Sequence, residues 1–317
     1  MLDNLIFCLN ATMPVFAVMV IGWILKKIKM LDEKSTAVIN RLVFRLFLPA
    51  LLFTNLAEQD FVSIWDGGFV LFCLVATVIS ILLAWAMAFL DKDKADRGEF
   101  IQASYRSAAA TLGIVFMTNI YDNAAMVALM IIGAVPVYNI IAVIVLSLTS
   151  PKEEQTKENG RLLASTLKGI ITNPIILGIL FGALWSVFKL PMPTIAGKTI
   201  NYLANVASPL ALIGLGASFE FSDLAAKLGP VLAVIFNKLI LFCVIFLPIA
   251  IHLGYRDDKL VAILIMLGSA TTSSSFIMAK NMGHDGVISA GAVMVTTLLA
   301  SFTLTFWLFL LKTFGYI

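Results

Sequence analysis

About ten apolar runs follow one another along the chain, and each is close to the length that crosses a bilayer as a helix. Such a crossing needs about 20 residues, and a helix suits the hydrocarbon interior because it satisfies its own backbone hydrogen bonds. The sequence therefore predicts an all-α polytopic membrane protein with about ten transmembrane helices. The expected helices are Leu5–Leu25, Thr36–Leu56, Gly68–Leu90, Phe100–Ile120, Ala124–Leu148, Leu163–Phe188, Ile200–Phe219, Pro230–Leu253, Leu260–Asn281 and Val287–Leu311.

The composition supports this class and excludes several others. Hydrophobic residues make up 60% of the 317 residues and charged residues 13%, against about 25% charged residues in soluble domains. The formal net charge of +3 is too small to indicate nucleic-acid binding. Cys8, Cys73 and Cys243 are scattered and predict neither a disulfide framework nor a metal site. Without a nucleophile–base or metal constellation, we expect a protein that is not an enzyme and holds no cofactor or metal.

The second half of the chain repeats features of the first half. Pro14 and Pro174 are 160 residues apart, and Asn40 and Asn201 are 161 apart. Each unit is expected to hold five helices, and an odd number reverses the direction of the second unit in the membrane. The predicted organisation is a first five-helix repeat over residues 1–150, a cytoplasmic linker over 151–163 and an inverted five-helix repeat over 164–317.

The fourth and ninth expected helices carry polar interruptions at matching places. Ser269–Ser275 holds six hydroxyl side chains in seven residues, and Ser107–Val115 aligns with it at an offset of 162 residues. A helix that is interrupted at membrane depth uses such groups to satisfy its freed backbone or to hold a polar ligand. The alternative is that small hydroxyl residues only let helices pack closely.

The repetition favours a binding site in which the two interrupted helices cross. The N-termini of the resumed half-helices would then attract an anion to the middle of the membrane. The residues expected to bind substrate there are Thr111, Gly113, Thr271, Thr272, Ser273, Ser274 and Ser275.

Four further polar residues stand out inside or beside these helices. Asn139 lies within the fifth expected helix, where a buried amide either supports a backbone break or contacts substrate. Lys238 lies near the middle of the eighth, where an ionisable side chain is a candidate functional group. Both are added to the predicted substrate-binding residues. Arg106 and Lys280 flank the interruptions and are candidates for entry or gating charges.

Basic residues are distributed unevenly among the loops of the first half. The loop after the second expected helix has Glu58, Asp60 and Asp66 and no Lys or Arg, whereas the loop before that helix is basic, with Lys26, Lys27, Lys29 and Lys34. The positive-inside rule then places the basic loops in the cytoplasm and both termini outside it. We expect a multi-pass protein of the cell (cytoplasmic) membrane.

Several segments resemble bacterial members of the auxin efflux carrier family, and the resemblance covers nearly the whole chain. They are Asn40–Phe44, Leu48–Ala50, Ser273–Gly283 and Thr296–Leu299. The resemblance implies two inverted five-helix repeats whose fourth and ninth helices cross at unwound middles. It also implies transport of organic anions, since bacterial relatives are commonly described as malate or other carboxylate permeases. The chain departs from the family pattern in three ways: Ala108 stands where Asn is usual, Val115 stands where Pro is usual, and the second interruption has Thr or Ser where Pro is usual.

The predicted function is a secondary transporter that moves a small organic anion, a carboxylate such as malate or an auxin-like acid, by alternating access. Two alternatives stay open: a sodium/proton-coupled antiporter on the same fold, and a non-transporting membrane sensor that binds a ligand. No carboxylate is expected within the membrane-spanning segments, because Glu58, Asp122, Glu220 and Asp257 all fall at helix ends, and this argues against a carboxylate-based sodium or proton site. The expected partners are the organic anion and the lipid bilayer, and no nucleic acid is expected. A proton or sodium as coupling ion and a homodimer both stay open.

Overall fold

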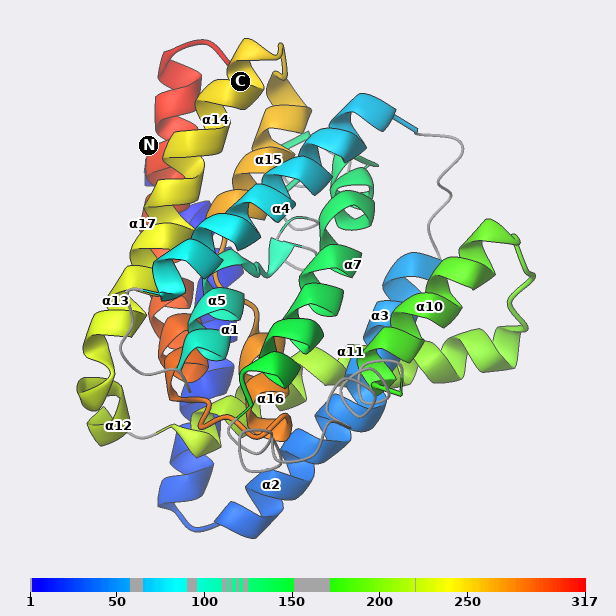
Figure 1. Ribbon diagram of the computed structural model, residues 1–317, viewed down its shortest axis with the longest axis vertical. Coiled ribbons are helices and arrows are strands. Elements are labelled where there is room, and N and C mark those ends of the chain that lie inside the picture. The colour runs from blue at the N-terminus through cyan, green and yellow to red at the C-terminus, as the bar shows by residue number, and fades with distance from the viewer. Residues whose placement is uncertain are drawn as a thin grey trace.

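The computed structural model describes residues 2–57, 65–89, 96–109, 113, 116–117, 120–121, 125–150, 172–219 and 221–317. All regular secondary structure in these residues is helical (Figure 1). The elements are α1 (Leu2–Lys27), α2 (Glu33–Leu42), η1 (Val43–Phe47), α3 (Leu48–Ala57), α4 (Gly67–Ala88), α5 (Arg97–Tyr105), α7 (Ala125–Leu148), α10 (Pro174–Val187), α11 (Thr194–Ser218), α12 (Phe221–Ala226), α13 (Leu228–Phe236), η2 (Asn237–Leu241), α14 (Phe242–His252), α15 (Asp257–Gly268), α16 (Ser273–Asn281) and α17 (Val287–Thr313).

Seven helical segments among these residues are long and apolar enough to cross a membrane. Two of them are continuous helices with a π-helical turn in the middle: η1 joins α2 to α3, and η2 joins α13 to α14. The predicted class, an all-helical membrane protein, is therefore confirmed. The seven segments are Glu33–Ala57, Gly67–Ala88, Leu129–Leu148, Thr194–Ser218, Leu228–His252, Asp257–Asn281 and Val287–Thr313, and the shorter Pro174–Val187 is also apolar.

Some helix bounds differ from the expected ones. α11 begins at Thr194 rather than Ile200, because Pro193 starts the helix and the polar residues that follow continue it. The expected helix Phe100–Ile120 is interrupted, since α5 ends at Tyr105. The predicted linker 151–163 and the expected start of the sixth helix lie outside the described residues.

The helices form two groups, which we call the panel and the scaffold (Figure 1). In the panel, α3 packs against α10 and α11, and α1 and α2 pack against α11. The scaffold contains α4, α5, α7 and α13–α17. α1 also packs against α17, so it joins the two groups.

Glycines allow the panel helices to approach closely. A Cβ atom on Gly216 would lie 1.9 Å from the carbonyl oxygen of Met19, and one on Gly178 would lie 2.6 Å from that of Pro49. Both distances are far inside van der Waals contact, so only glycine fits between these backbones. Small residues at helix contacts are the usual basis of helix association in lipid, where apolar burial gives no driving force.

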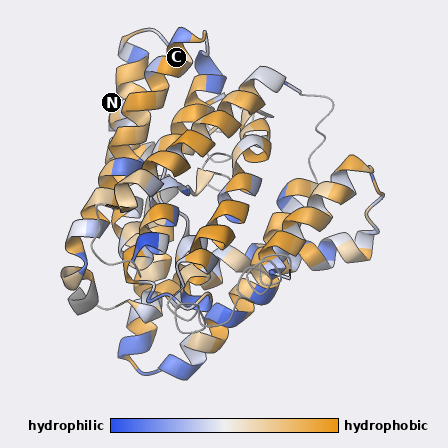
Figure 2. Cartoon of the chain, in the orientation of Figure 1, coloured by the Kyte–Doolittle hydropathy of each residue, from blue (hydrophilic) through white to orange (hydrophobic). Residues whose placement is uncertain are grey.

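The outer surface is strongly apolar. The exposed fractions of Ile195, Tyr202 and Val187 are 83%, 73% and 71%. Figure 2 shows helices that are hydrophobic along most of their length, with hydrophilic residues gathered around α2 and α16. A surface of this kind is suited to contact with lipid. Both termini lie toward the same end of the molecule, opposite α2 (Figure 1).

Candidate functional site

A non-helical stretch, Ser269–Thr272, separates α15 from α16 inside one apolar span. Ser269 and Thr272 have extended backbone, with ψ of 166° and 140°. Hydroxyl groups satisfy part of the freed backbone: the amide of Thr271 donates to Thr296 Oγ1 at 2.9 Å, and Thr271 Oγ1 donates to the carbonyl of Ala103 at 3.0 Å. The break forms without proline because these side chains replace the lost helical hydrogen bonds.

α5 ends in a similar way, and Arg106–Ala108 are non-helical. The two breaks are in direct contact, since the amide of Ala108 donates to the carbonyl of Ala270 at 2.8 Å. Gln102 Nε2 adds a second link by donating to the carbonyl of Ser275 at 2.8 Å. The polar stretches singled out in the sequence therefore meet in the interior of the scaffold.

Arg106, the first residue after α5, carries a buried charge at this meeting point. Its side chain is 2% exposed. One terminal nitrogen donates to Asn139 Oδ1 at 2.8 Å and to Ser274 Oγ at 2.7 Å, and the other to Gln102 Oε1 at 3.2 Å and Met278 Sδ at 2.7 Å. The Nε hydrogen has no acceptor among the described residues. All of these partners are neutral, so the positive charge is left uncompensated within the described part of the chain.

Arg106 lines a small cavity between the panel and the scaffold. The cavity has a volume of about 70 Å³. The scaffold contributes Asn139 from α7 and the start of α16, and the panel contributes Leu48 and Asn55 from α3. The full lining is Leu48, Leu51, Leu52, Asn55, Arg106, Ser107, Ala108, Val135, Tyr138, Asn139, Ile175, Ser208, Thr272, Ser273 and Ser274. Four of the predicted site residues, Asn139 and Thr272 to Ser274, are brought together here.

The other predicted site residues lie elsewhere. Thr271 lines a second cavity of about 60 Å³ that shares Ala108, Ser208, Thr272 and Ser273 with the first. Ser275 is buried, and its Oγ has no hydrogen-bond partner in the described residues. Gly113 is buried against α7, because a Cβ atom there would lie 3.0 Å from Val127 Cγ1, and it lines neither cavity. Thr111 lies outside the described residues.

Lys238 also lies away from the two cavities. Its Nζ donates to main-chain carbonyls of Tyr105 and Met266, on the side of the breaks that faces η2. Arg106, a candidate entry or gating charge from the sequence, lies in the wall of the first cavity. The signal in the sequence was that Arg106 is the single charged residue of the expected helix Phe100–Ile120.

A buried carboxylate, Glu99, was not anticipated from the sequence. Its side chain is 2% exposed and accepts from the amides of Gly286 at 2.6 Å and Ser289 at 3.0 Å. These amides belong to the start of α17, where the helix dipole favours negative charge. Glu99 therefore caps α17 from a neighbouring helix and does not line the cavity.

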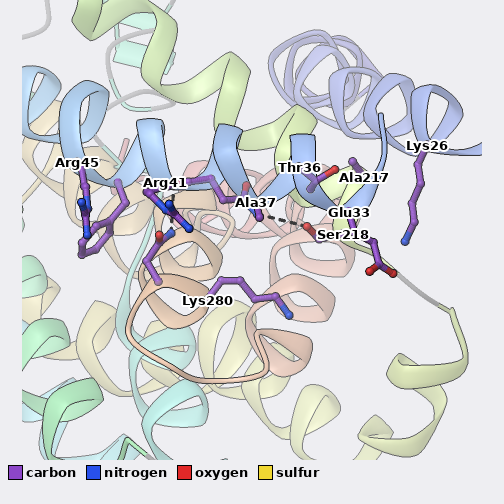
Figure 3. Close-up of a pocket in the computed structure, with 12 residues that line it drawn as sticks. Lys26, Glu33, Thr36, Ala37, Arg41, Arg45, Ala217, Ser218 and Lys280 are labelled. Carbon is purple, nitrogen blue, oxygen red and sulfur yellow. Dashed lines mark hydrogen bonds between the residues drawn. The ribbon is translucent and has the colours of Figure 1, made fainter. Parts of the chain in front are cut away.

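A wider vestibule of about 700 Å³ opens at the end of the molecule that holds α2 (Figure 3). Its lining includes four basic side chains, Lys26, Arg41, Arg45 and Lys280, and one acidic side chain, Glu33. The vestibule and the small cavity are both bordered by the continuous helix α2–η1–α3 and by α16. Arg45 and Lys280 border the vestibule, and Leu48 and Ser274, about one and two helical turns away from them along the same helices, border the cavity.

Comparison with known proteins yields one matching family and two relatives that extend over almost the whole chain. The model of the family described as "Membrane transport protein" matches residues 7–308. A Methanothermobacter thermautotrophicus protein named "Uncharacterized transporter" is 21% identical over 304 residues, 94% of this chain and 96% of its own. A Rhizobium meliloti protein named "Putative malonate transporter" is 21% identical over 310 residues, 95% of each chain.

Proposed function

We propose that this chain, which belongs to the membrane transport protein family, is a secondary transporter that moves a small organic anion by alternating access. Family membership gives membrane transport as the general activity. The observation that supports an anionic substrate is the buried guanidinium of Arg106, whose hydrogen-bond partners among the described residues are all neutral.

A buried charge without a counter-ion is costly, and proteins normally pair it. No described carboxylate pairs with Arg106, although the scaffold holds a buried one in Glu99. An anionic substrate in the cavity would supply the missing partner. A guanidinium is well suited to this, because its planar fork matches the two oxygens of a carboxylate.

The other cavity groups fit the same ligand. Thr272, Ser273 and Ser274 present hydroxyl donors, and they stand at the N-terminus of α16, where free amides and the helix dipole attract anions. Asn139 Oδ1 accepts from Arg106 and holds the guanidinium in place. The site would therefore bind one carboxylate group through Arg106 and the α16 hydroxyls.

The substrate class that fits is a short aliphatic carboxylate. The cavity of about 70 Å³ favours a small acid over a large aromatic one. The name of the Rhizobium meliloti relative, a malonate transporter in its printed wording, points to the same class. Malonate, malate and similar acids are thus the first substrates to test.

The arrangement of the helices suggests how the site would change sides. The cavity lies between panel and scaffold, so sliding of one group against the other would expose it alternately to each side. Ten helices in two inverted repeats remain our proposal for the complete topology. The hydrogen bond between Ala108 and Ala270 supports it, because the repeat aligns these two residues.

The vestibule would serve as the entrance from the side that we propose to be cytoplasmic. Clefts lined by one sign of charge concentrate ions of the opposite sign and raise their association rate. Arg41, Arg45 and Lys280 would draw the anion toward the start of the cavity (Figure 3). Loss of these charges should slow uptake from that side more than from the other.

The deciding experiment is uptake of a labelled carboxylate panel into proteoliposomes, with and without imposed proton and sodium gradients. Uptake of one acid with competition by its analogues would support the carrier and identify the substrate class. Gradient-driven sodium or proton movement without flux of any acid would instead support an antiporter. Ligand binding without flux of either kind would support a sensor.

A further inference from the structure

The buried ammonium of Lys238 lies near the breaks, has no carboxylate partner among the described residues and does not line the substrate cavity. Lys238 lies in the π-helical turn η2, and its side chain is fully buried, at 0% exposure. It lines neither of the two small cavities nor the vestibule. A π-turn in the middle of a long apolar helix often marks a functional position.

The contacts of Lys238 are with the ends of both interrupted helices. Its Nζ donates to the carbonyl of Tyr105 at 3.4 Å and to the carbonyl of Met266 at 3.3 Å. Tyr105 is the last residue of α5, and Met266 lies in the last turn of α15. The ammonium thus bridges two helix C-termini that come together behind the breaks.

The convergence of these two helix ends favours a cation. The last four carbonyls of a helix lack partners within the helix, and the end carries roughly half a negative charge. Within the described part of the chain, the Lys238 ammonium donates to two main-chain carbonyls and to no carboxylate. In carriers with interrupted helices, such freed carbonyls are the groups that coordinate a coupling sodium ion.

We propose that Lys238 is a tethered cation that takes the place of a coupling sodium ion, so that this carrier moves its anion without sodium. The proposal rests on the transport function proposed above. The covalently attached ammonium holds the ends of α5 and α15 together in every step of the cycle. Arg106, one residue beyond Tyr105, is thereby held in position to face the cavity.

The first test uses the unaltered protein. Uptake of the transported acid is measured with all external and internal sodium replaced by choline. We expect rates within twofold of those in sodium. A strict requirement for sodium would overturn the proposal, and this arm depends on no variant.

The second test removes the ammonium and measures whether a soluble cation restores uptake. Lys238→Ala should reduce uptake at least tenfold and leave space beside the freed carbonyls. Sodium or methylammonium should restore part of the uptake to Lys238→Ala but none to Lys238→Met, whose side chain fills the space without charge. Lys312→Ala, at the exposed end of α17, is the control that should behave as the unaltered protein.

Thermal unfolding in detergent gives a readout that needs no substrate. Sodium or methylammonium should raise the melting temperature of Lys238→Ala by about 3 °C or more relative to choline, and leave the unaltered protein unshifted. Full uptake by Lys238→Ala, or a loss that neither cation reverses in flux or melting, would refute the tethered cation. If no acid is transported at all, the function proposed above fails while this melting comparison still decides the role of Lys238.

Discussion

Replacing Arg106 with Gln tests the anion site most directly. The guanidinium already donates to Asn139 and Ser274 at 2.8 and 2.7 Å, and its Nε hydrogen has no acceptor among the described residues. A bound carboxylate would therefore gain charged hydrogen bonds from a group that is already positioned. Each contributes about 1.5–3 kcal/mol, and part of the gain offsets the cost of desolvating the anion.

We take about 3 kcal/mol as the net contribution of Arg106 to binding of the transported anion. Because each 1.4 kcal/mol is a factor of ten, the expected loss in kcat/KM for Arg106→Gln is roughly 150-fold. Arg106→Lys should lose less, since it keeps the charge but not the planar fork.

The fold should survive this change. Gln is shorter but still hydrogen-bonds, and the variant removes a buried charge that no described carboxylate compensates. The melting temperature without substrate should therefore stay within a few degrees of the original. Stabilisation by added substrate, in contrast, should disappear.

The assay is the initial rate of carboxylate uptake into proteoliposomes, normalised to the amount of inserted protein. Arg256→Gln is the matched control, because it removes an exposed guanidinium from the loop before α15, far from the cavity lining, where that group donates to main-chain carbonyls and lies over the ring of Tyr316. If Arg106→Gln keeps uptake within threefold of the unaltered protein, Arg106 does not bind the anion and the proposed site is wrong.

Three further predictions follow from other parts of the molecule. Thr272→Val combined with Ser273→Ala should reduce uptake below detection while membrane insertion stays normal, since both side chains line the cavity; undiminished uptake would remove this stretch from the site. Gly216→Ala should destabilise the panel by about 1–3 kcal/mol in thermal unfolding, because its Cβ would lie 1.9 Å from a carbonyl oxygen of α1, whereas Gly229→Ala, with no atom within 4 Å, should be neutral. The hydrogen bond with the ammonium of Lys259 lowers the pKa of Asp66 below its ordinary value of 3.8. The stabilisation of the fold by this pair is therefore present above pH 3.8 and lost as the pH falls further. Melting curves of Asp66→Asn, which keeps the helix cap of α4, should show a smaller acid-induced decline in melting temperature.

The hydrophobic pattern was sufficient to predict the class of fold. Apolar runs of membrane-spanning length dictate helices, because lipid offers no partner for unpaired backbone groups. The bounds of α4, α7 and α17 fall within a few residues of the expected ones for this reason. α11 started earlier than expected, since its first turns are polar and an apolar criterion does not include them.

The candidate site was predicted less completely. The hydroxyl-rich stretch 269–275 predicts an interruption, because lipid-facing helices gain nothing from such residues. The structure has a break at Ser269–Thr272, and Ser273–Ser275 already belong to α16. Its individual side chains could not be assigned, since Thr271 turns back to α5 and Ser275 is buried, while Thr272 to Ser274 line the cavity. The direction in which each of these side chains points depends on the residue at which α16 begins, Ser273.

Hydropathy and the chemistry of small hydroxyl residues were enough to predict a helical membrane protein with two polar interruptions. The contacts of each buried charge could not be predicted in the same way. Arg106, Lys238 and Glu99 are all charged side chains in or beside apolar segments. Contacts with residues far away in sequence direct the first to a cavity, the second to two helix C-termini and the third to a helix N-terminus. A charge responds to the groups that surround it in space, and that arrangement is set by how the helices pack rather than by the neighbours along the chain.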